Sequence, residues 1–240
     1  MTALIRGEAI KLRSTRTALG FAAAALLLVL AVVLVSTLAG DPRTLEDKRA
    51  AIGFGGVLSL PLAIFGVVGA TGEYRHRTLA PALLVAPGRT QLVVARTIAY
   101  GAAGLLIGLA MLVLTFAIGI PLLAGAPGPD LGAGDYLRVG AGGVAAAGLS
   151  AALGVGLGTV VRNQVAAVVG FVVYLFIAEP LVALLSDTTS KYTLGQVQTA
   201  VGAGTSGDLL PWGLALVVLV GWTVAAVVAG AVADAGRDVV

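Results

Sequence analysis

Apolar residues in this chain fall into six long runs that alternate with shorter polar segments. An α-helix needs about 20 mainly apolar residues to cross the roughly 30 Å hydrocarbon core of a bilayer. Runs of that order cover residues 17–39, 51–71, 97–123, 138–161, 165–185 and 211–233. The pattern therefore predicts an all-α integral membrane protein, in which residues 1–240 form a single domain with six transmembrane helices.

The first sixteen residues predict a separate helix that lies on the membrane surface. Leu4 or Ile5, Ala9 and Leu12 recur at helical spacing, and basic residues lie between them. This arrangement is typical of an amphipathic helix in the interface plane. A signal peptide also begins with basic residues, but the apolar run that follows here is too long and lacks a small-residue cleavage site. We expect residues 1–16 to stay attached as an N-terminal interfacial helix.

Two of the connecting segments predict different structures. The segment 40–50 has balanced charge and predicts a polar turn. The segment 186–210 is longer and keeps apolar positions such as Leu194, Val197 and Val201. We expect this outer segment to hold a short helix that lies in, or dips into, the interface.

Small residues recur within the third and fourth spans. Gly104 and Gly108 form a small-xxx-small pattern, as do Gly154 and Gly158. This spacing lets the backbones of neighbouring helices approach closely in a membrane. The run that contains Gly154 is superficially similar to a dinucleotide-binding loop, but its place inside an apolar span favours helix packing.

Composition excludes several kinds of site. Apolar residues make up 58% of the chain and charged residues 11%, whereas soluble domains have about 25% charged residues. The absence of cysteine excludes disulfides and thiolate metal sites, and the single histidine disfavours a conventional zinc site. The lysines follow Ile10, Asp47 and Ser190, so the sequence has no Gly-Lys-Ser/Thr phosphate-binding loop. We expect the chain to bind neither a cofactor nor ATP.

Basic residues predict the orientation of the six spans. Ten of the fifteen lie on the side that holds the two termini: Arg6, Lys11, Arg13, Arg16, Arg75, Arg77, Arg89, Arg96, Arg162 and Arg237. Basic loops stay in the cytoplasm. We therefore expect both termini, and the segment 72–96, to be cytoplasmic in a multi-pass plasma-membrane protein.

The segment 72–96 carries four arginines, more basic residues than any other segment between two apolar runs. Thr78 is a suitable N-cap for a short helix over about residues 78–86, and Pro87 ends it. Leu79, Leu83 and Leu84 would lie on roughly one face of that helix. The pattern predicts a docking surface for a partner. The alternative is that the basic residues only fix the topology and bind anionic lipid.

The same segment resembles the loop between the second and third spans of type-2 ABC exporter permeases. The N-terminal residues 8–16 also resemble the opening segment of that family. The residues that carry the loop resemblance are Glu73, Tyr74, Arg75, Thr78, Leu83, Leu84, Pro87, Arg89 and Arg96.

The resemblance implies a bacterial membrane-spanning permease subunit of an ATP-driven exporter. It implies a dimer with a second copy or a paralogue, and a separate ABC ATPase subunit that binds ATP and Mg²⁺. It further implies that the helix over residues 78–86 is a cytoplasmic coupling helix contacting that ATPase. Docking would involve Glu73, Arg75, Arg77, Thr78, Leu79, Leu83, Leu84, Pro87 and Arg89.

Two other functions fit parts of the pattern. An intramembrane hydrolase would need a nucleophile such as Ser59 or Ser150 beside a base, but His76 lies in the basic segment. We therefore expect no enzymatic activity in this chain. A non-transporting six-span assembly, immunity or anchoring protein would share the topology without needing a translocation path.

Glu179 is the acid that the pattern places within a span. A carboxylate in lipid is costly, so we expect it to face protein, water or a basic partner such as Arg138 or Lys191. It would then serve either as an outer gate that contacts substrate or as one half of a structural ion pair. The scarcity of polar residues in the spans favours an apolar or amphipathic substrate.

Overall fold

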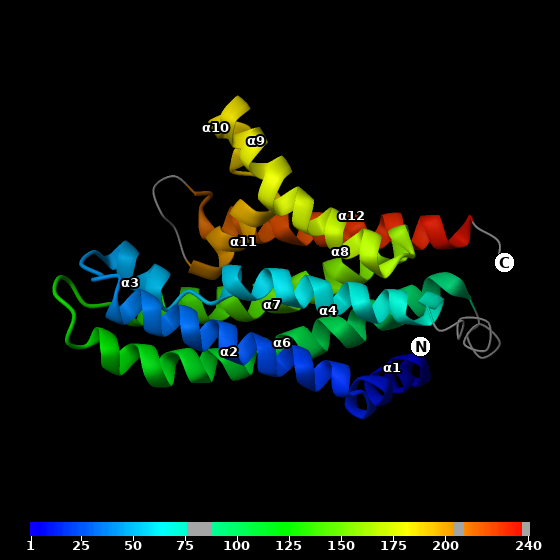
Figure 1. The fold of residues 1–240 in the computed structure, drawn as a ribbon, viewed down its shortest axis with the longest axis horizontal. Coiled ribbons are helices and arrows are strands. Elements are labelled where there is room, and N and C mark those ends of the chain that lie inside the picture. Colours follow the sequence, from blue (N-terminus) through cyan, green and yellow to red (C-terminus); the bar gives the residue numbers. More distant parts are fainter. Residues whose placement is uncertain (76–87, 204–208, 237–240) are drawn as a thin grey trace.

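The computed structural model describes residues 1–75, 88–203 and 209–236. Within these ranges the regular elements are all helices (Figure 1). Six helical segments are long and apolar enough to cross a membrane: Thr17–Leu38, Leu45–Gly72, Thr90–Leu123, Ala133–Val161, Gln164–Leu185 and Trp212–Ala235. The predicted all-α membrane protein with six spans is thereby confirmed.

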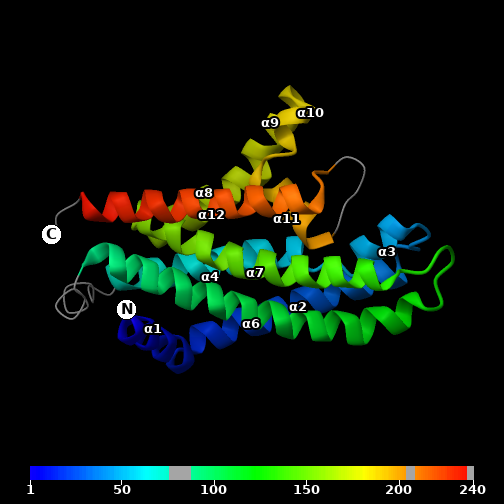
Figure 2. The same cartoon turned by 180° about the vertical axis from the view of Figure 1, so that it is seen from behind.

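The long helices run along one axis of the molecule. Figures 1 and 2 show α1 and the C-terminal end of α12 at one end of this bundle, and α3 at the opposite end. The elements in chain order are α1 (Thr2–Ser14), α2 (Arg16–Leu38), α3 (Leu45–Ala51), α4 (Gly55–Arg75), α6 (Arg89–Leu123), α7 (Ala133–Val161), α8 (Gln164–Val173), the π-helical turn η1 (Tyr174–Ala178), α9 (Glu179–Leu185), α10 (Asp187–Ser190), α11 (Leu194–Ala203) and α12 (Trp212–Ala235).

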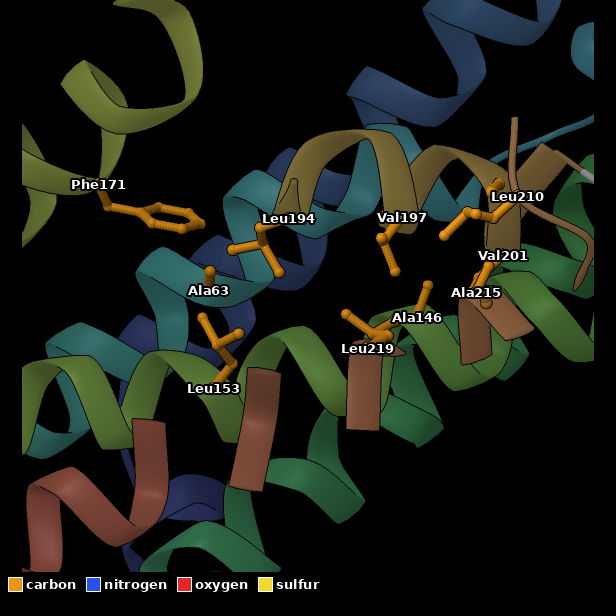
Figure 3. Packing of buried hydrophobic residues seen from close by; sticks show 11 residues of the cluster. Ala63, Ala146, Leu153, Phe171, Leu194, Val197, Val201, Leu210, Ala215 and Leu219 are labelled. Carbon is orange, nitrogen blue, oxygen red and sulfur yellow. The ribbon is translucent and has the colours of Figure 1, made fainter. Parts of the chain in front are cut away.

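Helix α7 is the centre of the bundle. It packs against α4, α6, α11 and α12, and 67% of its most apolar stretch is buried, against 11% for the span that contains α8 and α9. Its many glycine and alanine residues permit this, because small side chains let several helices approach one backbone. Figure 3 shows Ala146 and Leu153 of α7 packed among Ala63, Val197 and Leu219 from three other helices.

The segment 40–50 contains a helix where the sequence analysis predicted a polar turn. Helix α3 begins after Thr44, whose Oγ1 accepts a hydrogen bond from the amide of Asp47 at 3.1 Å. The carboxylate of Asp47 accepts one from the amide of Thr44 at 3.0 Å. This reciprocal capping box stabilises the helix. The helix is too short for a hydrophobic periodicity in the sequence to reveal it.

The segment 186–210 folds back into the bundle. Helix α11 packs against α4, α7 and α12, and its Leu194, Val197 and Val201 are buried. The expected short helix is therefore present, and it dips between the spans rather than resting on their surface.

The span that contains α8 and α9 is interrupted by one π-helical turn. The amide of Glu179 donates to the carbonyl of Tyr174, five residues earlier. Pro180 follows directly, and a proline inside an α-helix has no N–H to donate and clashes with the carbonyl four residues earlier. The wider turn accommodates it. Beyond this turn, α9 and α10 diverge from the other helices (Figures 1 and 2).

Candidate functional site

The predicted coupling segment is only partly described. Arg77, Thr78, Leu79, Leu83, Leu84 and Pro87 lie outside the described residues. Glu73 and Arg75 lie in the last turn of α4 and Arg89 begins α6, but their side chains are also outside the described part. The described part of the site therefore consists of the two flanking helices and α1, which packs on α6.

Arg96 connects these helices at the end of the bundle that holds α1. Its side chain is only 2% exposed, and its Nη1 donates to the carbonyl of Ala70 in α4 at 3.4 Å. Its Nε lies 3.8 Å from Oε2 of Glu8 in α1. Lys11 donates to the other carboxylate oxygen of Glu8 at 2.9 Å. A buried charge is costly without such partners, so these contacts hold α1, α4 and α6 together.

The burial of Arg96 differs from its expected place in an exposed basic segment. Helix α6 begins at Arg89, so Arg96 lies two turns inside it. Leu92 and Ala99 are buried on either side, and the spacing 92, 96, 99 is that of one helix face. This periodicity was a usable signal, as was Glu8, the single acid among the basic residues of α1.

A second charged contact ties the α7–α8 turn to the last span. Arg162 ends α7 with a left-handed backbone, φ 55°, and its Nη2 donates to Oδ1 of Asp234 at 2.6 Å. Asp234 is buried near the end of α12. The basic end of the bundle is thus cross-linked through α1, α4, α6, α7 and α12.

Glu179 is buried between the diverging α9 and the helix that dips into the bundle. Its Oε1 accepts a hydrogen bond from the amide of Gly195 at 2.8 Å, and Tyr174, Thr193 and Leu194 lie close to the carboxyl group. A Cβ added at Gly195 would overlap the carboxylate, so a larger residue there would force the Glu179 side chain to move.

The basic partners proposed for Glu179 do not contact it in the described part of the chain, where neither Arg138 nor Lys191 forms a salt bridge with this carboxylate. Helix α11 also forms a hydrogen bond between two uncharged side chains. Nε2 of Gln198 in α11 donates to Oγ of Ser150 in α7 at 3.0 Å. Glu179 and Gln198 therefore attach α11 to α9 and α7.

The four glycines singled out in the spans lie at helix contacts. A Cβ at Gly104 would lie 2.7 Å from the carbonyl oxygen of Ala147, and one at Gly108 would lie 2.8 Å from the Cβ of the same alanine. Gly154 lies against the backbone of Ala63, and a Cβ at Gly158 would lie 2.9 Å from the carbonyl oxygen of Val67. These glycines bring α6 and α4 against α7.

The two serines considered as nucleophiles have structural partners. Ser59 donates to the carbonyl of Gly55 at 2.8 Å, and Ser150 accepts from Gln198. Among the described residues there is no group of three histidine, cysteine or acidic side chains that could hold a metal ion. Comparison of the sequence with protein-family models and with curated proteins finds no match.

Proposed function

We propose that this chain is the membrane-spanning subunit of a bacterial ABC exporter of the type-2 permease class. The observation that carries the proposal is the contact of Arg96 with Glu8 and with the carbonyl of Ala70. It joins the two helices that flank the segment 76–87 to the N-terminal helix. The ends of α4 and α6 flank the segment that would receive a partner, and α1 is held against them.

This connection between α1, α4 and α6 suits a subunit that is driven by a separate ATPase. A separate ATPase would bind ATP and Mg²⁺ and press on the coupling helix over residues 78–86. Because packed helices respond as rigid bodies rather than deforming continuously, a displacement at the segment would move α1, α4 and α6 together. In this proposal both termini and the segment 72–96 lie in the cytoplasm, as the distribution of basic residues predicts.

A second copy of the chain, or a paralogue, is supported by the fifth span. Only 11% of its most apolar stretch is buried, and Leu184 and Leu185 are 83% and 86% exposed on the part that diverges from the bundle. In a dimer, a partner would cover this apolar surface, and the translocation path would form between the two copies. The few polar residues in the spans favour export of an apolar or amphipathic substrate.

The proposal is tested by purification of the tagged chain from its native membrane in mild detergent, with an assay for co-purifying ATPase activity. The test variant changes Leu79, Leu83 and Leu84 to Asp, and the matched control changes the same three residues to Met. We expect ATPase activity with the native chain and the Met control, and its loss with the Asp variant.

The other outcomes separate the parts of the proposal. ATPase activity with all three chains would leave the partner correct and place the docking surface elsewhere. No ATPase activity with a well-folded native chain would reject the permease assignment. A non-transporting assembly, immunity or anchoring protein would then fit the six-span fold better.

A further inference from the structure

Lys48 is a buried cation at the end of the bundle opposite α1. It lies in α3, and its side chain is only 1% exposed. Its Nζ donates to the carbonyl of Ala126 at 3.2 Å and lies 3.6 Å from Oδ1 of Asp130. Both partners belong to the loop between α6 and α7.

These partners leave the ammonium group incompletely satisfied. A lysine ammonium has three donors, and the 3.6 Å separation from Asp130 is longer than a hydrogen bond. The Asp130 side chain is 89% exposed. An exposed acid gains little from such a pair, so it can turn into water when another anion approaches. The Lys48 ammonium group can therefore exchange the Asp130 carboxylate for a better acceptor.

A cavity adjoins Lys48. Its volume is about 180 Å³, and Lys48, Asp130, Tyr136, Ile120, Leu123 and Leu131 contribute to its lining. The Tyr136 ring is held edge-on against Phe116 with the ring centres 5.6 Å apart. A cavity of roughly 150 Å³ can hold a benzene molecule. This one thus has the volume for a phosphate group with the first carbons attached to it.

The surroundings of the cavity match the boundary between headgroups and hydrocarbon. Charged pairs lie at the same end of the bundle, among them Arg49 with Asp135 at 2.8 Å. The apolar side of the cavity includes Ile120, which is partly exposed, and further along α6 Val113 faces outward. A ligand with an anionic head and an apolar continuation fits this boundary better than a fully polar one.

We propose that the Lys48 cavity binds the phosphate group of an anionic phospholipid headgroup. The phosphate oxygens accept hydrogen bonds from the Lys48 ammonium, and the Asp130 carboxylate leaves its position near Nζ. The carbons beside the phosphate lie against Leu123 and Leu131. Lysine is suited to this task as a compact point charge for phosphate. The bound lipid would pin α3 to the α6–α7 loop.

The test uses the full chain in nanodiscs of phosphatidylcholine alone or mixed with phosphatidylglycerol, with bound phosphatidylglycerol counted by native mass spectrometry after delipidation. Inorganic phosphate, titrated onto the detergent-solubilised chain and followed by calorimetry, separates a lipid site from a free-phosphate site. The variants are Lys48→Met, Asp130→Asn and, as a matched control, Lys191→Met, which removes a lysine outside the cavity.

We expect the native chain to retain phosphatidylglycerol. Lys48→Met should bind this lipid about tenfold more weakly, because it loses one charged hydrogen bond. Asp130→Asn removes the competing carboxylate and should bind more tightly, which keeps the test usable if Lys48→Met does not fold. Binding of inorganic phosphate with the same dependence on Lys48 would support the phosphate site with a soluble ligand as its source. Equal binding by native and Lys48→Met chains, equal loss with Lys191→Met, or weaker binding by Asp130→Asn would overturn the proposal.

Discussion

Arg96 illustrates how one buried charge can organise several helices. Its guanidinium group reaches Ala70 in α4 and Glu8 in α1. Because the side chain is buried, water cannot easily replace either contact. Removing one partner of a buried ion pair costs more than the pair itself contributes, because the remaining charge loses its compensation. The same reasoning makes the exposed pair of Arg43 with Asp41 nearly dispensable.

Replacing Arg96 by Met leaves Glu8 paired with Lys11, so it should destabilise the protein by about 2 kcal/mol, and should loosen α1 from α6. Thermal unfolding of the purified chain in detergent measures the change. The matched control, Arg43→Met, removes an exposed pair and should cost no more than about 1 kcal/mol. Equal effects of the two substitutions would show that Arg96 does not hold the helices together.

Gly195 is the second residue whose identity the structure explains. A methyl group at this position would overlap the carboxylate of Glu179, so Gly195→Ala must displace this side chain and disturb its hydrogen bond with the amide of residue 195. We expect a loss of about 1–3 kcal/mol in the same unfolding assay. Gly221→Ala is the matched control, because no atom lies within 4 Å of the added Cβ and alanine favours the helix. An unchanged stability of Gly195→Ala would mean that the Glu179 contact is not maintained.

At the scale of elements, the short helices show where sequence patterns lose their power. Long apolar runs predict spans because their length alone decides the matter. Helix α3 depends instead on the capping pair of Thr44 and Asp47, a signal present in the sequence but hidden by the polar composition. The depth of α11 depends on packing against α7 and on Gln198 reaching Ser150, which no local pattern reveals.

Thr44→Ala should remove the side-chain acceptor at the start of α3 and cost about 1 kcal/mol. The effect should be local, because the helix is short and depends on its cap. Hydrogen exchange should become faster at the amides of α3, starting with that of Asp47. Thr44→Ser keeps the hydroxyl group and should exchange like the native chain. Faster exchange in both variants would assign the effect to lost packing of the Thr44 methyl group.

At the scale of the whole molecule, the sequence predicts the six spans and the helical class, but not the burial of Arg96. Charge alone places residues 72–96 in one basic segment, whereas the helical spacing of residues 92, 96 and 99 indicates a buried face. The structure extends α6 back to Arg89, which converts Arg96 from a surface charge into a buried one. The coupling helix itself lies outside the described residues and stays a prediction.

If the exporter proposal is correct, the end of the bundle that holds α1 should transmit the action of the ATPase to the spans. If Glu73 joins the coupling segment to the spans, Glu73→Gln should reduce ATP-driven transport in inside-out vesicles by about tenfold, the loss expected for one charged contact. Membrane insertion should be unchanged. Glu46→Gln, at the opposite end of the bundle, is the matched control. Transport at the native rate by Glu73→Gln would remove this residue from the coupling path.

The orientation of the bundle decides which surface a cytoplasmic ATPase could reach. The chain contains no cysteine, so single cysteines can be labelled without background. Gly132 directly precedes α7, and the α6–α7 loop lies at the α3 end of the bundle (Figure 1). Thr2 begins α1 and Gly236 follows α12, at the other end. Because basic segments stay in the cytoplasm, a membrane-impermeant maleimide added to intact cells should label Gly132→Cys alone. All three should react after the membrane is permeabilised, which controls for thiol accessibility.

Labelling of Thr2→Cys and Gly236→Cys in intact cells would put the end of the bundle that holds α1 outside the cell. No cytoplasmic ATPase could act on it there, and the exporter proposal would fail.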